Sequence, residues 1–139
     1  MANRLTLEIV TPDRLLLHKE ADEITVPGLN GEMGILPGHT PLISQLSVAG
    51  LVTYRNGSEQ GLAFISQGFA EVMPDRVTIL AERAQLPEEI DLAKAKAALQ
   101  DAERVLKSAE KDASINIESA LAALDSAIVQ VQVAERTKR

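Results

Sequence analysis

The chain has 139 residues and no cysteine, which excludes disulfide bonds, thiolate metal sites and cysteine nucleophiles. Its net charge is −6 and its aromatic content is 2%, so we expect no nucleic-acid binding by phosphate neutralisation or base stacking. The apolar runs are short and the first residues show no signal-peptide pattern. We therefore expect no transmembrane helix, and a cytosolic or organelle-encoded protein.

Residues 1–86 predict an all-β domain. Leu5, Leu7 and Ile9 recur at every second position, the period of a half-buried strand. Asn56-Gly57 is a strong hairpin signal. Further strands are expected at residues 23–26, 50–54, 62–66, 69–73 and 77–80, with breaks at Pro12-Asp13, Pro27-Gly28, Gly68 and Pro74-Asp75. Short strands at this spacing, about eight to ten in all, are typical of a sandwich or a barrel.

Residues 87–139 change to a helical period and predict an antiparallel two-helix hairpin, which makes the whole chain α+β. Asp91 is placed to cap the first helix and Asn116 the second, after a break around residues 112–116. The first helix repeats apolar residues at Leu92, Ala95, Leu99, Ala102, Leu106 and Ala109. The second carries a heptad-like stripe of Ile117, Leu121, Leu124, Ile128 and Val131, which we expect to be its packing face.

The hairpin is rich in alanine, with twelve alanines and no aromatic residue between Asp91 and Glu135. Alanine lets helices approach closely but buries little area, whereas a buried leucine or isoleucine contributes about 1.5–3 kcal/mol. Two interpretations follow from this composition. The hairpin is either a detachable element or a permanently packed part of the sandwich.

The most unusual segment is residues 26–44, which hold four glycines and three prolines in addition to Glu32 and His39. Glycine permits positive φ and proline fixes φ, so the segment follows a specific path. It is either a set of tight turns between strands or a rigid loop that presents Glu32 and His39 to a partner. His18 is the only other histidine, so a structural or interface role for His39 is favoured over metal binding or general base catalysis.

The run Gly-x-x-Gly-Ile-Leu-Pro-Gly-His-x-Pro-Leu at residues 31–42 resembles the signature of the epsilon subunit of rotary ATP synthases. The resemblance extends over essentially the whole chain. It includes the opening Leu-x-Leu-x-Ile-Val-x-Pro at residues 5–12, the segments at 68–72 and 77–81, and the alanine-rich hairpin.

This resemblance implies that residues 1–86 form a β-sandwich docked on the gamma subunit and the c-ring. It also implies that residues 87–139 form a regulatory hairpin. That hairpin folds against the sandwich or extends along gamma into the alpha/beta catalytic head, where it inhibits ATP hydrolysis. In this reading Glu32, Gly38, His39 and Pro41 belong to the contact with the c-ring and gamma. The protein would lie at the cytoplasmic face of the bacterial plasma membrane, or the stromal face of the thylakoid if organelle-encoded, associated with the membrane only through the complex.

Residues 90–95 resemble an ATP-binding motif of some bacterial epsilon subunits, of the form Ile/Leu-Asp-x-x-Arg-Ala. Ile90 and Asp91 match this motif, but Lys94 stands where arginine is expected, and Asp101 occupies the place of a second arginine. Lysine lacks the planar fork of arginine, and Asp101 would repel phosphate. We therefore expect ATP as a weak regulatory ligand at most, and no other cofactor. The alternative is that Asp91 acts only as a helix cap.

Three cations, Arg104, Lys107 and Lys111, cluster near the turn between the two helices. One hypothesis is that they bind an acidic loop of a catalytic beta subunit when the hairpin extends. The alternative is a solvated face in which they alternate with acidic residues.

No motif supports catalysis, because the sequence contains no phosphate-binding loop, no Gly-x-Ser-x-Gly elbow and no His-Glu-x-x-His. We assign no catalytic or metal-ligating residue and expect a non-catalytic rotor subunit. The alternative from another class is a stand-alone ligand-binding β-sandwich with a helical dimerisation hairpin.

Overall fold

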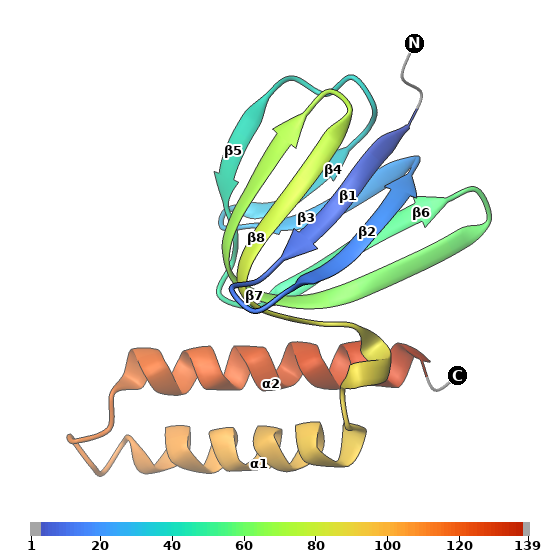
Figure 1. Cartoon of the computed structure of the whole chain (residues 1–139). Coiled ribbons are helices and arrows are strands. Elements are labelled where there is room, and N and C mark those ends of the chain that lie inside the picture. The colour runs from blue at the N-terminus through green and yellow to red at the C-terminus, as the bar shows by residue number, and fades with distance from the viewer. Residues whose placement is uncertain (1–3, 138–139) are drawn as a thin grey trace. The chain divides into compact units, whose positions relative to one another are not determined.

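The computed structural model describes residues 4–137 and has strands up to Gln85 followed by helices (Figure 1). The chain divides after Leu86 into two compact units. The expected α+β fold, a β-sandwich followed by two helices, is confirmed. The strands are β1 (Leu5–Val10), β2 (Leu15–Ala21), β3 (Glu23–Gly28), β4 (Gly31–Ile35), β5 (Leu42–Gln45), β6 (Gly50–Asn56), β7 (Glu59–Met73) and β8 (Arg76–Gln85). The helices are a 3-10 turn η1 (Pro87–Glu89), α1 (Leu92–Ser108) and α2 (Ile117–Thr137).

The strands are hydrogen-bonded in the order β2-β1-β8-β7-β6-β3-β4, and β5 pairs with β7 outside this path. The β1–β8 pair is parallel, and the other described strand pairs are antiparallel. The core between the layers is built from aliphatic side chains with no exposed area, such as Leu7, Ile9, Ile24, Val72 and Ile79. This is the packing expected of a sandwich in which the inward side chains of both layers interdigitate.

The long strand β7 belongs to both layers, because its two halves pair with different strands on the same edge. Residues 59–65 pair with β6, whereas residues 69–72 pair with β5. Between them Gln67 and Gly68 have φ of 52° and 148°. A Cβ on Gly68 would lie 1.9 Å from the carbonyl oxygen of Leu80 on β8, so only glycine fits this bend. The amide of Leu46 donates to the carbonyl of Gly68 at 2.9 Å, which ties the end of β5 to the bend.

Three details of the strand prediction are wrong. The sequence pattern assigned no strand to residues 15–21, yet β2 lies there. The strand expected to stop at Pro27-Gly28 continues to Gly28, opposite Gly31 of β4. The expected split of residues 62–73 at Gly68 is a bend within one strand.

The hairpin seam of α2 is made of alanine rather than of the expected Ile and Leu stripe. Ala120, Ala127 and Ala134 recur every seven residues and are buried, as are Ala95 and Ala102 of α1. Leu124 and Val131 of the predicted stripe are half-buried, but its other members, Ile117, Leu121 and Ile128, are exposed. Both repeats fit a heptad, and the alanine repeat is buried because small side chains allow closely spaced helices.

By length and composition alone, α2 is the one described helix that could cross a membrane, over Ile117–Arg136. The expectation of no such helix is wrong by this criterion, because alanine and valine join the short Leu and Ile runs into one apolar stretch. The criterion is also met by packed helices of hairpins, and α2 packs along α1.

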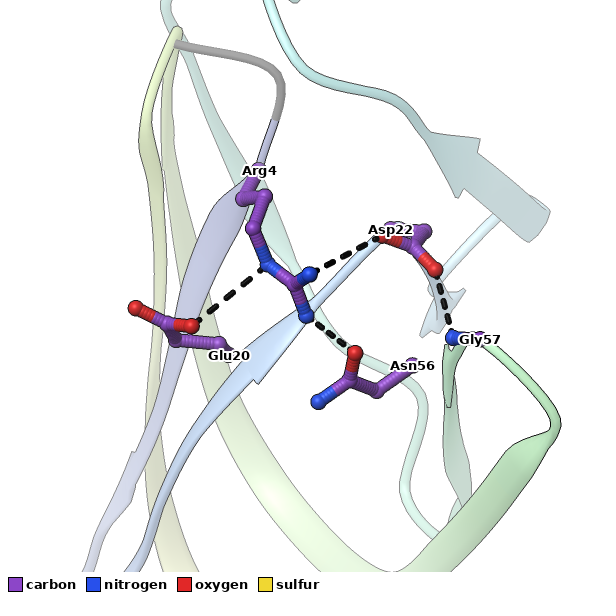
Figure 2. A network of polar contacts seen from close by, with 5 residues as sticks. All are labelled: Arg4, Glu20, Asp22, Asn56 and Gly57. Atoms are coloured by element: carbon purple, nitrogen blue, oxygen red, sulfur yellow. Dashed lines mark hydrogen bonds and ion pairs between the residues drawn. The ribbon is translucent and has the colours of Figure 1, made fainter.

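A polar network fixes the start of β1 (Figure 2). Arg4 lies between Glu20 and Asp22, with N···O distances of 3.5 and 3.8 Å, and donates to the side-chain oxygen of Asn56. Asp22 accepts a 2.6 Å hydrogen bond from the amide of Gly57. The network joins β1, the end of β2 and the turn between β6 and β7. Because the groups are exposed, each pair contributes modestly, about 1 kcal/mol or less.

Replacing Gly68 tests the bend of β7. We expect Gly68→Ala to lower the free energy of unfolding by about 3 kcal/mol, because the new Cβ meets the Leu80 carbonyl and the φ value is unfavourable for alanine. Urea unfolding followed by circular dichroism measures this. The matched control is Gly34→Ala on β4, where a Cβ meets nothing within 4 Å and stability should change by about 1 kcal/mol or less. Equal effects of the two substitutions would contradict the role given to the bend.

Candidate docking surface

Cross-strand register places an apolar row on the outer face of the sheet. Phe69 of β7 is opposite Leu80 of β8, Leu80 is beside Val10 of β1, and Val10 is opposite Leu15 of β2. Leu15, Phe69 and Leu80 are 54%, 51% and 51% exposed. A row of large apolar side chains across four strands, open to solvent, is typical of a protein–protein contact.

Charged side chains border this row. One register step away, Glu8 of β1 lies 3.8 Å from His18 and 3.6 Å from Arg76. Glu71, which is opposite Thr78, continues the same polar row on β7. The outer face therefore combines an apolar centre with a polar rim, the usual composition of a binding surface.

Two depressions adjoin the Phe69 end of the row, and both are lined by Leu29 and Gln45. One of about 380 Å³ also includes Gln67, Phe69 and Glu82. The other, of about 390 Å³, surrounds the turn between β3 and β4 and includes Glu32. The amide of Leu29 donates to the carbonyl of Gln45 at 2.9 Å, which holds this turn against β5.

The predicted c-ring and gamma contacts lie on the segment that contains β4 and β5. Glu32 is exposed on β4 opposite Pro27, and Pro41 is exposed just before β5. Gly38 has φ of 88° and donates from its amide to the carbonyl of Pro74 at 2.7 Å. Half-buried His39 donates from its amide to the carbonyl of Leu36 at 3.2 Å. The segment is thus part strand and part turn, anchored to the β7–β8 turn.

The structure does not join Glu32 and His39 in one contact. Glu32 is near the start of β4 and His39 lies beyond its end at Ile35. At about 3.3 Å per strand residue, the stretch from Glu32 to Ile35 alone spans about 10 Å. Nδ1 of His39 is 2.7 Å from the carbonyl oxygen of Thr40, so a proton on Nδ1 is donated locally and Nε2 remains for a partner.

The candidate ATP site begins at a helix cap. Asp91 accepts a 3.1 Å hydrogen bond from the amide of Lys94, which identifies it as the N-cap of α1. Ile90 is buried, and Lys94 is exposed on the first turn. Asp101 forms an ion pair with Arg104. This arrangement leaves the Asp91 carboxylate occupied by the helix end, as a plain cap requires.

The three candidate cations of the hairpin are exposed. Arg104 and Lys107 are one helical turn apart near the end of α1, and Lys111 follows in the connection to α2. The next residue, Asp112, accepts hydrogen bonds from the hydroxyl and amide of Ser114 at 2.6 and 2.9 Å, and these hold the pKa of its carboxyl below the usual value. The connection therefore places three cations beside a carboxylate that is already engaged. Among residues 4–137, no group of three potential ligands could hold a metal ion.

Comparison with known proteins decides the family. Residues 4–87 match the domain described as ATP synthase, Delta/Epsilon chain, beta-sandwich domain, and residues 88–135 match the long alpha-helix domain of the same chain. The chain belongs to the ATP synthase delta/epsilon chain family. The resemblance drawn from residues 31–42 is thereby confirmed.

Individual delta/epsilon relatives agree with this assignment. The ATP synthase epsilon chain of Koribacter versatilis is 50% identical over 107 residues, which cover 77% of this chain and 75% of that protein. ATP synthase epsilon chain 2 of Syntrophotalea carbinolica is 46% identical over 100% of this chain and 99% of its own length. A chain of the Euglena gracilis mitochondrial ATP synthase (OSCP/F1/c-ring) is 27% identical with a TM-score of 0.78, covering 99% of this chain and 82% of that one.

The register-derived apolar row is the part of the surface that sequence reasoning missed. A possible signal was outward parity on β7, since Ala70 and Val72 are buried and Phe69 must then point the other way. The row itself could not be found, because it depends on which strands become neighbours.

Replacing Asp91 separates a helix cap from a nucleotide ligand. Asp91→Asn keeps a capping oxygen and should leave the stability within about 0.5 kcal/mol, whereas Asp91→Ala should lower it by about 1 kcal/mol. Thermal unfolding measures both changes. Isothermal titration with ATP should show no micromolar binding to the unchanged chain. Micromolar binding that Asp91→Asn abolishes would contradict the cap-only role.

Proposed function

We propose that this chain is a non-catalytic rotor subunit of the central stalk of an ATP synthase. It couples rotation of the c-ring to the catalytic head through gamma, and its helical hairpin inhibits ATP hydrolysis. Family membership carries this proposal, and the likeness to a chain of the Euglena mitochondrial complex over 99% of the sequence supports it.

The sandwich would supply the fixed part of the contact. Phe69, Leu80 and Leu15 are half-exposed, so covering each contributes about 1 kcal/mol before the costs of association. The polar rim that includes Glu8 and Arg76 would set orientation more than affinity. We assign this face to gamma, and we assign Glu32, Gly38, His39 and Pro41 to the contact with the c-ring and gamma at the loop.

The hairpin would supply the movable part. Its seam buries alanine side chains, and each contributes much less than the 1.5–3 kcal/mol or so of a buried leucine. A weakly held helix pair can exchange between two arrangements when a partner binds one of them better. In the extended arrangement Arg104, Lys107 and Lys111 bind an acidic loop of a catalytic beta subunit in the alpha/beta head.

In this role the protein is peripheral to the cytoplasmic face of a bacterial plasma membrane, or to the stromal face of the thylakoid, and is associated with the membrane only through the complex. ATP is at most a weak regulatory ligand at Ile90, Asp91 and Lys94. Its partners are protein subunits and not nucleic acid.

One observation favours the alternative, a stand-alone sandwich with a dimerisation hairpin. Ile117, Leu121 and Ile128 are exposed on α2 and could pair with a second copy. Sedimentation separates the two functions. A rotor subunit is a monomer alone and co-purifies with gamma, whereas the alternative predicts a dimer that ignores gamma.

Neutralising the hairpin cations tests inhibition. In the intact complex, Arg104→Gln/Lys107→Gln/Lys111→Gln should raise ATP hydrolysis about twofold or more, because a charge-paired contact with the head is lost. Deletion of residues 88–139 should raise it at least as much. The matched control is Lys94→Gln/Lys96→Gln at the other end of α1, which should leave the rate unchanged. Unchanged hydrolysis by an assembled triple variant would contradict the beta-subunit contact, and unchanged hydrolysis by the deletion would contradict inhibition by the hairpin.

A further inference from the structure

The two depressions beside the β7 bend form one continuous groove, since they share Leu29 and Gln45. We call this surface the bend groove, with Glu32 at one end and Glu82 at the other. Its floor is fixed by backbone pairing, because Gln45 is opposite Phe69 and its carbonyl accepts the amide of Leu29. The groove is therefore a feature of the sheet and not of a loose loop.

The centre of the bend groove is apolar. Leu29 and Phe69 line it and are 52% and 51% exposed, although both are large enough to be core residues. Their exposure costs the free chain stabilisation that a partner's apolar side chain would recover, about 1 kcal/mol for each.

The ends of the bend groove are acidic and uncompensated. No lysine, arginine or histidine lines either depression. None of the ion pairs among residues 4–137 includes Glu32 or Glu82, whereas Glu8, Glu20 and Glu23 each have a cationic neighbour. Two carboxylates without a cation, at opposite ends of an apolar groove, fit a partner with two positive charges separated by an apolar group.

Backbone strain adds an independent observation. Gln67 lines the groove, and it is the one non-glycine among residues 4–137 with positive φ, at 52°. Such a conformation costs about 1 kcal/mol that glycine would avoid, and retained strain of this kind concentrates at functional sites. It places an amide side chain in the groove wall, near that of Gln45, where both can bind the backbone of an extended segment.

We propose that the bend groove binds a polypeptide segment in which an apolar side chain is flanked on both sides by lysine or arginine. The apolar group lies between Leu29 and Phe69, and the cations pair with Glu32 and Glu82. The segment belongs to another subunit of the complex, so this inference rests on the proposed function and adds Leu29, Gln67, Phe69 and Glu82 to its contacts.

Photo-crosslinking identifies the occupant directly. With p-benzoylphenylalanine in place of Phe69 in the assembled complex, we expect a crosslink to a segment that has lysine or arginine within a few residues on both sides of an apolar one. The same probe in place of Glu59, exposed at the far end of β7, should not label that segment. Absence of a crosslink at position 69, or a crosslink to a segment without basic residues, would overturn the proposal.

Affinity measurements separate the groove from the wider function. Rebinding to a complex stripped of this chain should weaken about tenfold in Glu32→Gln/Glu82→Gln and become less dependent on salt. The control Asp13→Asn/Glu59→Gln removes two exposed carboxylates outside the groove and should rebind like the unchanged chain. If the unchanged chain binds and the groove variant matches the control, the groove proposal alone fails. If the unchanged chain does not bind, the proposed function fails with it.

Discussion

The close approach of Gly68 to the carbonyl of Leu80 lets one strand serve both layers of the sandwich. Because β7 bends there without leaving β8, its first half can pair with β6 and its second half with β5. The same bend places Phe69 on the outer face and Gln67 in the wall of the groove. The apolar row, the groove and the anchored segment before β5 therefore depend on one backbone contact that only glycine allows.

The two units are stabilised by different side chains, and this difference matters for function. The sandwich buries leucine, isoleucine and valine completely, whereas the helix pair is closed mainly by alanines such as Ala102 and Ala127. Burial of small side chains yields little free energy per residue, so most of the hairpin's helical order must come from intrinsic propensity and caps. Such an element can change its arrangement while the sandwich keeps its own.

Local signals in the sequence predicted much of this fold, and long-range pairing accounts for what they missed. The turn at Asn56-Gly57 and the caps at Asp91 and Asn116 depend on a few neighbouring residues and are confirmed. Strands β4 and β5 lie in a segment rich in glycine and proline, which edge positions tolerate because one side of the strand has no ladder. The seam of α2 was misjudged because two heptad repeats compete, and the face that α1 offers decides between them. The outer apolar row is set by register across four strands, which no single run of residues encodes.

Amide hydrogen exchange on the isolated full-length chain tests the central claim most directly, that a rigid sandwich built on the β7 bend carries a separately held hairpin. We expect amides of β7 and β8 on both sides of Gly68 to exchange only by global unfolding. Amides of α2 should exchange through openings at least about 2 kcal/mol less costly. Equal protection of α2 and β7 would contradict the account, because the hairpin would then be as firmly fixed as the sandwich.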